Sequence, residues 1–458
     1  MKTDTIAVIA TAMTNSGIGI IRISGNDSFE IIDKIYKPKK GEKKLSQVKS
    51  HTIHYGYICD GEKVVDEVMV LIMKAPNSYT TEDTVEIDCH GGTLVMKRIL
   101  ETVIKYGARP AEPGEFTKRA FLNGRIDLSQ AESVIDVINA KNDFALESSV
   151  HQLQGAVLNK IKEIRRKVIH EIAFIESALD DPEHISIEGY GEELLKIMKE
   201  VSSDVDNLLK SSENGELLKE GINTVIVGKP NAGKSSLLNV LVGKERAIVT
   251  NIAGTTRDVL EEQINLNGIT LNIVDTAGIR NTDDIVEKIG VDKAKEYLLN
   301  ADLIIYVVDS SAPLDENDEE IIEMIQNRKS IILLNKTDLE QEITVEELAK
   351  KTTHKIIPIS AKERTGIDVL EDTIKDMFFK GEISFNDEVY ITNVRHKTAL
   401  QESLKSFKMV MNSIEAGMPE DFYSIDLMNA YEELGSIIRE SVGEDLVNEI
   451  FSKFCMGK

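Results

Sequence analysis

The chain has 458 residues, 41% hydrophobic residues, no Trp and a formal net charge of −24 at pH 7. This length predicts about three domains of ~150 residues. No apolar run reaches the ~18 residues of a transmembrane helix, so we expect no membrane partner. A strongly acidic protein does not attract nucleic acid through its overall field, so any RNA contact should be local or shared with a partner.

The three cysteines, Cys59, Cys89 and Cys455, lie far apart and show no C-x-x-C spacing. This pattern disfavours a disulfide framework or a zinc site and fits a reducing compartment. The first ten residues lack the basic, apolar and small-residue order of a signal peptide, so we expect a cytoplasmic protein. Cys59 and Cys89 fall in or near strand-like runs and are expected in a core.

Residues 1–120 mix short β-like runs with glycine turns, at 19–25, 67–73 and 84–92. An apolar segment at 94–104 follows and predicts a helix. We therefore expect a compact α+β domain over residues 1–120.

A long apolar stripe follows, with a mean step of about 3.7 residues, which is typical of one face of a helix. It is formed by Leu146, Val150, Leu153, Val157, Ile161, Ile164, Val168, Ile172, Ile175 and Leu179. The pattern predicts a single long helix, which must pack on other helices. The C-terminal region supplies matching apolar faces, formed by Leu400, Leu404, Phe407, Leu427, Tyr431, Leu434 and Ile438. We therefore expect one all-α domain built from residues 121–216 and 383–458, interrupted by an inserted domain over 217–382.

Charge clusters are expected to be solvated surface. Basic clusters occur at 97–98, 118–119 and 165–167, and an acidic run at 315–320 lies inside the inserted domain. The acidic run is expected to begin a solvated helix.

Residues 228–235 fit the phosphate-binding loop G-x-x-x-x-G-K-[ST]. A strand-like run at 224–227 precedes the loop, and an amphipathic segment at 235–242 follows it, which is the context that the motif requires. The backbone N–H groups of such a loop cradle phosphate oxygens. Lys234 would reach the terminal phosphates, and Ser235 would bind Mg²⁺.

Two segments after the loop have the pattern of switches. In 254–258, Thr256 is the candidate second Mg²⁺ ligand. In the D-T-A-G motif at 275–278, Asp275 would hold Mg²⁺ through water and Gly278 would donate its N–H to the γ-phosphate.

Guanine specificity is predicted by N-K-x-D at 335–338, after an apolar run at 331–334. A carboxylate accepts both the ring N–H and the exocyclic amine of guanine, a pair of donors that adenine lacks. Ser360, Ala361 and Lys362, after a run at 356–359, match the second base-contacting loop. The order of these motifs predicts an α/β P-loop GTPase domain of the Ras-like type.

The predicted GTP-binding residues all lie in these motifs or in the first switch. They are Asn231, Ala232, Gly233, Lys234, Ser235, Ser236, Thr250, Asn251, Ile252, Ala253, Gly254, Thr255, Thr256, Asp275, Thr276, Ala277, Gly278, Asn335, Lys336, Asp338, Ser360, Ala361 and Lys362.

Hydrolysis needs a group other than the Gln that follows D-T-A-G in Ras-type enzymes, because this chain has Ile279 there. The pattern G-x-P-N-x-G-K-S followed by G-T-T-R-D resembles the potassium-activated GTPases. The resemblance implies K⁺ ligands at Asn231, Thr250, Ile252 and Thr255. The alternative for Asn231 is a side chain that only stabilises the loop.

Glu287 is the hypothesised catalytic residue, polarising the attacking water through a second water. It begins a helix-like segment after the D-T-A-G motif. The alternative is a solvated carboxylate without a catalytic role.

The layout and motifs together resemble the MnmE (TrmE) family of tRNA-modification GTPases, over essentially the whole chain. Besides the GTPase motifs, the resemblance rests on G-I-I-R-I-S-G at 19–25, H-G-G at 90–92, P-G-E-F-T-K-R-A-F-L-N-G at 113–124 and the terminal C-x-G-K at 455–458. It implies a homodimer whose N-terminal domains bind 5-formyl- or methylene-tetrahydrofolate. With the FAD protein MnmG, in a heterotetramer, the family adds a carboxymethylaminomethyl or aminomethyl group to the tRNA wobble uridine.

The family's folate contacts fall on Arg22, Glu86, Arg125 and Lys458. A carboxylate such as Glu86 can accept the pterin donors, and cations can meet the glutamate tail. The family often has Lys where this chain has Arg125, which keeps the charge but changes the donor geometry. Cys455 has two open interpretations, a thiol that takes part in one-carbon transfer and a small buried residue.

Two alternatives come from other classes of protein. A ribosome-assembly GTPase shares the phosphate-loop pattern, but such proteins usually carry a basic RNA-binding appendage such as a KH domain. A folate-binding protein with a vestigial GTPase domain is disfavoured by the intact phosphate loop and the complete N-K-x-D motif.

Overall fold

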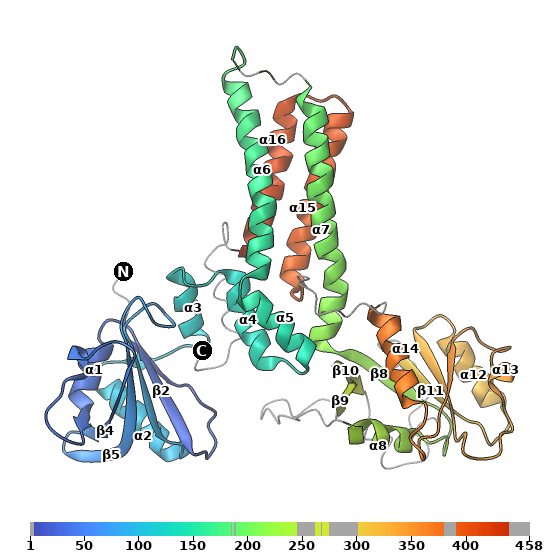
Figure 1. Cartoon of the computed structure of the whole chain (residues 1–458), viewed down its shortest axis with the longest axis horizontal. Helices are drawn as coiled ribbons and strands as arrows, with labels where there is room; N and C mark the ends of the chain where they lie inside the picture. Colours follow the sequence, from blue (N-terminus) through green and yellow to red (C-terminus); the bar gives the residue numbers. More distant parts are fainter. Residues whose placement is uncertain are drawn as a thin grey trace. The chain divides into compact units, whose positions relative to one another are not determined.

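The computed structural model describes residues 4–184, 186, 189–244, 262–266, 268–273, 301–379 and 391–438. They fall into two compact units (Figure 1). Unit 1 comprises Met1–Ile135, Gln152–Met198 and Lys405–Lys458, and unit 2 comprises Asp136–His151 and Lys199–Leu404. Among the helices described, none has the length and apolar character needed to cross a bilayer.

The N-terminal part of unit 1 is a seven-stranded sheet of order β3-β4-β5-β6-β2-β1-β7. Its strands are β1 (Ile6–Ile9), β2 (Ile18–Ser24), β3 (Tyr36–Pro38), β4 (Thr52–Asp60), β5 (Lys63–Met73), β6 (Thr84–His90) and β7 (Arg109–Pro110). All neighbours are antiparallel except β1 and β7. The helical segments are α1 (Ser28–Ile35), η1 (Leu45–Gln47), α2 (Thr93–Lys105) and α3 (Glu115–Leu122).

Alternation along β2 and β6 divides this sheet into two faces. Ile21 and Ile87 point into the core under α1 and α2, and Arg22 and Glu86 lie on the opposite face. The expected α+β domain and the helix near 94–104 are confirmed. Cys59 and Cys89 are buried, also as predicted.

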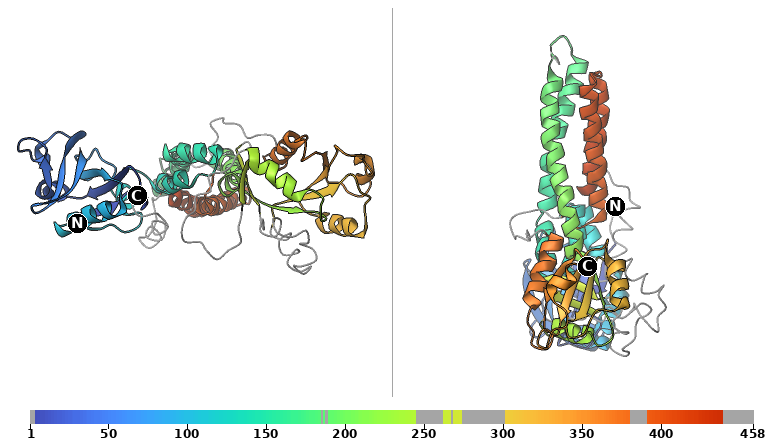
Figure 2. Two further views of the ribbon diagram at one scale, coloured as in Figure 1. Left: turned by 90° about the horizontal axis from the view of Figure 1, so that it is seen from below. Right: turned by 90° about the vertical axis from the view of Figure 1, so that its right-hand side faces the viewer.

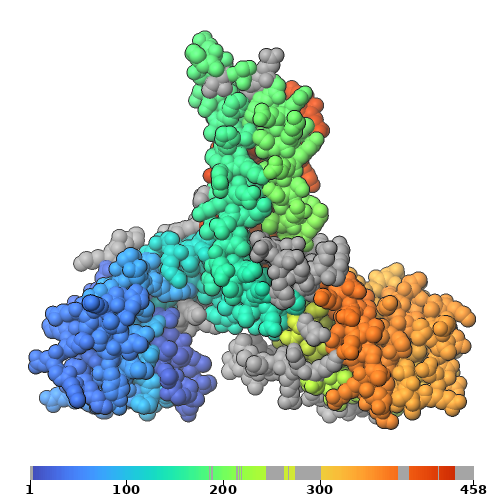
Figure 3. Space-filling model, in the orientation of Figure 1, coloured from blue at the N-terminus to red at the C-terminus, as the bar shows by residue number. Residues whose placement is uncertain are grey.

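The described residues of the expected all-α domain are mainly helical. Their helices are α4 (Leu128–Asn139), α5 (Asp143–Leu153), α6 (Ala156–Asp180), α7 (Tyr190–Glu220), α15 (Val394–Glu415) and α16 (Glu420–Ile438). Within unit 1, α16 packs along α6 (Figures 1–3), and the first part of α7, which belongs to this unit up to Met198, contacts α6. The rings of Phe174 and Tyr190 pack with centroids 4.6 Å apart. Tyr190 also donates a 2.5 Å hydrogen bond to Glu171.

The prediction of one helix over 146–179 is wrong, because the chain turns between α5 and α6. Gly155 has φ of +93°, a left-handed conformation that favours glycine. The side-chain amide of Gln130 donates to the carbonyl of Leu153 at 2.8 Å. The apolar stripe continues across this break, so periodicity alone did not reveal it.

Two of the basic clusters each contain one buried arginine, so they are solvated surface only in part. Arg165 is 6% exposed, and its guanidinium lies 3.8 Å from the ring centroid of Tyr431 on α16. Arg119 is also 6% exposed and is surrounded by carboxylates. A sequence pattern predicts that charged residues lie on the surface, because most do. It cannot show which cation has carboxylate or aromatic partners in the protein core.

Unit 2 contains a six-stranded sheet of order β13-β12-β11-β8-β10-β9. The strands are β8 (Ile222–Val227), β9 (Glu262–Leu266), β10 (Ile269–Ile273), β11 (Leu303–Asp309), β12 (Ser330–Asn335) and β13 (Lys355–Pro358). The helices are α8 (Lys234–Lys244), α12 (Glu316–Ile325), α13 (Val345–Leu348) and α14 (Ile367–Phe379). All strands except β9 run parallel, and apolar clusters cover both faces, as expected for an α/β domain.

Helix α12 begins where the acidic run predicted, with Asp315 as the N-cap of a capping box. The run is not fully solvated, however. Asp318 is 1% exposed and accepts a 2.6 Å hydrogen bond from Tyr306 on β11. The buried hydroxyl is a partner that the sequence did not reveal.

The link between α4 and α5 packs on the α/β sheet of unit 2. The buried side-chain amide of Asn142 donates to Thr270 on β10 at 2.9 Å, and Phe144 lies against Gly268. These contacts explain why residues 136–151 belong to unit 2, although the sequence pattern placed them in the helical domain.

Candidate nucleotide-binding and N-terminal sites

The candidate nucleotide site lies at the carboxyl edge of the parallel strands of unit 2. The phosphate loop follows β8, the N-K-x-D motif follows β12, and the S-A-K motif follows β13. Because these strands are parallel, the three motifs meet at one edge. Strand β8 lies between β10 and β11, so the chain crosses to opposite sides of β8, and ligands of α/β sheets bind at such switch points.

The phosphate loop needs backbone conformations that its sequence permits. Gly228 has φ of +153°, and a Cβ there would overlap the carbonyl oxygen of Val307. Asn231 has φ of +60°, a region that Asn tolerates better than most residues. The ammonium of Lys234 donates to the carbonyls of Gly228 at 2.8 Å and Lys229 at 2.7 Å. The lysine is therefore held against the loop that it is predicted to serve.

Asn335 joins the phosphate loop to the second base loop. Its buried amide donates to the carbonyl of Ala232 at 2.8 Å, and its carbonyl accepts from the N–H of Ala361 at 3.1 Å. A Cβ on Gly233 would overlap the Asn335 amide nitrogen. One side chain thus fixes the spacing of two predicted GTP-binding segments.

Asp338 is the carboxylate predicted to bind guanine. Its Oδ1 accepts from the Ser360 hydroxyl at 2.7 Å, and the Lys362 ammonium lies 3.8 Å from Oδ2. The Ser360 hydrogen bond lowers the pKa of Asp338 below its ordinary value, and Lys362 acts in the same direction. The carboxylate is therefore ionised near neutral pH, as acceptance of two guanine donors requires.

Lys336 is held in place by Asp309, a residue that was not predicted from the sequence. The Lys336 ammonium lies 2.5 Å from Asp309 at the end of β11, and Lys336 has φ of +65°. Burial raises the pKa of Asp309, but the bonds from Lys336 and Ser311 outweigh it and lower the pKa overall. The signal was available, because Asp309 ends β11 and is the only charged residue of that strand.

Ser235 and Ser236 lie in the first turn of α8, and Ser236 and Asn231 are exposed. A hydroxyl at this helix start is a suitable oxygen ligand for Mg²⁺. Among the residues that the structure describes, no group of three or more His, Cys, Asp or Glu side chains could hold a metal ion.

A second site lies in the N-terminal sheet of unit 1. Arg22 on β2 pairs directly with Glu86 on β6, with 2.6 Å between Nε and Oε1, and both side chains are 18% exposed. The Arg22 guanidinium lies 5.9 Å from the ring centroid of Tyr79 and 5.6 Å from that of Phe116. The Arg125 guanidinium lies 4.6 Å from the same Tyr79 ring centroid. The structure thus brings together the three predicted folate residues that it describes.

Tyr79 and Phe116 were not predicted, because neither lies in a charge pattern typical of ligand contacts. The segment that carries Tyr79 is attached to α3 and its C-cap. The Tyr79 hydroxyl lies 2.9 Å from that of Thr117, and the Asn123 amide donates to the Thr80 carbonyl at 2.7 Å. These bonds fix the segment whose ring lies near both arginines.

Two family models cover most of the chain. Residues 5–125 match the model described as the GTP-binding protein TrmE N-terminus, and residues 128–455 match the MnmE helical domain. The chain belongs to the MnmE family. It is accordingly a GTPase, and this membership favours the tRNA-modification expectation over the ribosome-assembly alternative.

Relatives named tRNA modification GTPase MnmE match over their whole length. The protein from Lachnoclostridium phytofermentans is 61% identical over 458 residues, covering 100% of both chains. The one from Clostridioides difficile is 51% identical over 457 residues, covering 99% of each. The solved G domain of the T. maritima FeoB iron transporter is 30% identical and covers 34% of this chain and 98% of its own, with a TM-score of 0.26, too low to support an argument.

Several residues that the GTPase motifs and the family resemblances predicted lie outside the described residues. These are Thr250, Asn251, Ile252, Ala253, Gly254, Thr255, Thr256, Asp275, Thr276, Ala277, Gly278, Glu287, Cys455 and Lys458. Their roles stay predictions, as do the roles of the described residues in binding GTP, K⁺ or folate.

Proposed function

We propose that this MnmE-family GTPase is activated by K⁺ and, with an MnmG-type FAD protein, modifies C5 of the tRNA wobble uridine. The added group would be carboxymethylaminomethyl or aminomethyl, and 5-formyl- or methylene-tetrahydrofolate would supply one carbon. The observation that carries the GTPase part is Asn335, which bridges Ala232 and Ala361 and so joins the phosphate and base loops. Family membership carries the tRNA part.

In the nucleotide site, Asp338 would select guanine, Lys234 would neutralise phosphate charge, and Ser235 with Thr256 would hold Mg²⁺. Asn231, Thr250, Ile252 and Thr255 would hold K⁺, whose charge would offset that developing between the β- and γ-phosphates. Glu287 would orient the attacking water through a second water.

In the N-terminal site, Arg22, Glu86, Arg125 and Lys458 would bind the folate. The supporting geometry is the Arg22–Glu86 pair beside Tyr79, with Arg125 on the same ring. An aromatic face suits a flat pterin, and the guanidinium groups suit the carboxylates of its glutamate tail.

The proposed protein is a cytoplasmic homodimer that forms a heterotetramer with the FAD protein. Its proposed domains are an N-terminal folate-binding and dimerisation domain (1–120), a helical domain (121–216 and 383–458) and the GTPase domain (217–382). Ordering of the switch segments around the γ-phosphate would close the paired GTPase domains and couple hydrolysis to tRNA modification.

GTP turnover in K⁺ and Na⁺ buffers of equal ionic strength tests the cation site. We expect K⁺ to stimulate turnover, and Asn231→Ala to remove the stimulation while GTP still binds. Equal rates in the two buffers would refute potassium activation. Full stimulated turnover in Glu287→Ala would refute the role of Glu287.

Binding of 5-formyl-tetrahydrofolate tests the second site. Arg22→Ala and Arg125→Ala should each weaken binding, and Arg98→Ala is the matched control because Arg98 is an exposed arginine on α2 that pairs with Glu101. Equal affinities in all three variants would remove folate from the proposal.

A further inference from the structure

Residues 37–49, named here the lysine loop, reverse the acidic character of the chain. Six lysines and a single acidic residue, Glu42, lie in this segment, whereas the whole chain carries −24. All six lysines are exposed: Lys37, Lys39, Lys40, Lys43, Lys44 and Lys49. A local positive patch of this kind is where an acidic protein could still meet a polyanion.

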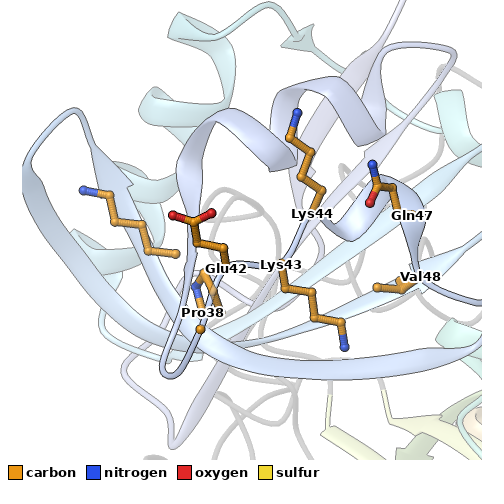
Figure 4. A pocket seen from close by; sticks show the side chains of 8 residues that line it. Pro38, Glu42, Lys43, Lys44, Gln47 and Val48 are labelled. Carbon is orange, nitrogen blue, oxygen red and sulfur yellow. The ribbon is translucent and has the colours of Figure 1, made fainter.

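The lysine loop surrounds a hollow of about 860 Å³ (Figure 4). Lys37, Lys43 and Lys44 line it together with one carboxylate, Glu42, whereas Lys40 lies in the loop but does not line the hollow. The side chains of Lys43 and Lys44 extend in opposite directions (Figure 4). They therefore do not converge on a single phosphate, but could reach separate phosphates along a chain.

Part of this positive charge is not neutralised by neighbouring carboxylates. Lys39 pairs with Glu67 at 3.0 Å. For Lys40, Lys43 and Lys44, the described parts of the chain supply no ion-pair partner. The Lys43 ammonium lies 3.1 Å from Nδ1 of His54. Burial and the charge of Lys43 lower the pKa of His54, so the imidazole is neutral at pH 7 and adds no competing charge.

An exposed aromatic ring lies beside the lysine loop. Tyr55 on β4 is 51% exposed, and the Lys39 ammonium lies 4.8 Å from its ring centroid. Basic grooves with adjacent aromatic rings are typical of surfaces that bind single-stranded nucleic acid, because bases stack on the rings while cations follow the backbone.

We propose that the lysine loop binds the phosphate backbone of tRNA. This inference rests on the proposed function, in which tRNA is the substrate. Divergent lysines around a hollow suit a curved chain of spaced phosphates better than one small anion. A flat anionic bilayer could not enter the hollow, whereas a curved phosphate chain could.

The primary experiment compares two triple variants of the full chain. K40Q/K43Q/K44Q removes three lysine-loop charges that have no ion-pair partner among the described residues. The control, K196Q/K199Q/K408Q, removes three exposed lysines of α7 and α15. Binding of unmodified tRNA transcript is measured from about 50 to 200 mM KCl, the range over which phosphate contacts weaken strongly.

We expect the lysine-loop variant to bind tRNA at least about tenfold more weakly at 100 mM salt, with the slope of log K against log salt reduced by about 2 to 3, as three lost phosphate contacts predict. The control should match the wild type, and GTP turnover should be unchanged in both. A lysine-loop variant with the wild-type affinity and slope would overturn the lysine-loop site alone. Failure of the wild type to bind tRNA would overturn both the site and the tRNA part of the proposed function.

Two further measurements separate direct tRNA contact from a folding defect and from membrane binding. Acetylation footprinting of the wild type, which needs no variant, should show protection of Lys40, Lys43 and Lys44 by tRNA, and equal modification would refute the site. Phosphatidylglycerol vesicles test a membrane partner. Loss of vesicle binding with retention of tRNA binding in the lysine-loop variant would also refute the proposal.

Discussion

Lys229 in the phosphate loop and Asp318 near the start of α12 form an ion pair of 2.7 Å. The Asp318 side chain is 1% exposed, and that of Lys229 is 22% exposed. Burial lowers the pKa of Lys229, but hydrogen bonds to Asp318 and Asp315 outweigh it and raise the pKa overall. The pair connects the phosphate loop to the helix that follows β11, through a residue that the loop motif leaves unspecified.

Lys229→Ala should weaken GTP binding, because it leaves the buried Asp318 carboxylate with fewer donors and releases one end of the loop. We expect the free energy of GTP binding to weaken by about 1–3 kcal/mol. This is less than the cost of breaking a fully buried pair, because Lys229 is partly exposed. Fluorescent GTP titration measures it. Lys229→Arg should retain most of the affinity, and Lys350→Ala, at an exposed lysine of unit 2, should change nothing.

A double-mutant cycle with Asp318→Asn distinguishes the pair from two independent effects. The double variant should lose less than the sum of the single losses. Strict additivity would mean that Lys229 and Asp318 do not act together.

Gly233→Ala should sharply reduce GTP binding. The new Cβ would overlap the amide of Asn335, and φ of +98° at this position is strained for any residue with a Cβ. Strain of about 1–3 kcal/mol corresponds to about 5- to 150-fold in affinity. Gly243→Ala in α8 is the control, since a Cβ there meets nothing within 4 Å and should stabilise the helix slightly. Equal GTP affinities in the two variants would contradict the role of Asn335.

Asp338→Asn should convert the base preference from guanine towards xanthine. The amide offers a donor where xanthine has a carbonyl, and it no longer accepts both guanine donors. We expect GTP affinity to fall at least ~100-fold and xanthosine triphosphate to bind better. Ser360→Ala removes one hydrogen bond to Asp338 and should cost only about 1 kcal/mol. Competition between the two nucleotides checks both variants.

Arg119→Ala should destabilise the N-terminal domain and weaken folate binding. Its buried guanidinium lies within 3.2 Å of Glu82, Glu115 and Asp4 oxygens, and Glu82 belongs to the segment that carries Tyr79. Arg109 would still pair with Asp4 and Glu115, but the buried Glu82 carboxylate would lose the Arg119 cation, which should cost about 3–5 kcal/mol. Asn123→Ala, a milder change that removes the bond to Thr80, should weaken folate binding with little loss of stability. Unchanged folate affinity in Asn123→Ala would separate the Tyr79 segment from the site.

Cys89 should resist alkylation in the folded protein. Burial, with a smaller effect from Asp66, raises its pKa from 9.0 to about 11, so only about one thiol in a thousand is ionised at pH 8. Because the folded pKa lies above the unfolded value, the free energy of unfolding does not depend on this thiol below pH 9 and falls as the pH rises from 9 through 11. Mass spectrometry after iodoacetamide treatment, with and without denaturant, checks it. Rapid labelling of the folded chain at Cys89 would contradict this burial.

The nucleotide motifs could be predicted because each is contiguous. Asn231 and Gly233 both adopt positive φ and lie two residues apart in the chain. A short sequence motif is therefore enough to show that the loop needs residues that tolerate this conformation. The strand before each motif is equally local, since four apolar residues are enough to indicate it. Asn335 shows the limit: its motif was recognised, but its bond to Ala232 joins residues 103 positions apart.

The sequence by itself determined the α+β, all-α and α/β classes of the three parts, the insertion of the α/β part into the all-α part, and the positions of the phosphate and base loops. It could do so because side-chain periodicity and the need for residues that tolerate positive φ are both visible in short stretches of sequence. Only the tertiary structure decided that Arg119 and Arg165 are buried, that Gly155 divides the long apolar stripe, and that Arg22 and Arg125 both lie near the Tyr79 ring. Those outcomes depend on partners distant in the chain, whose hydrogen bonds and ring contacts offset the desolvation of the charged groups. Periodicity contains no information about such partners.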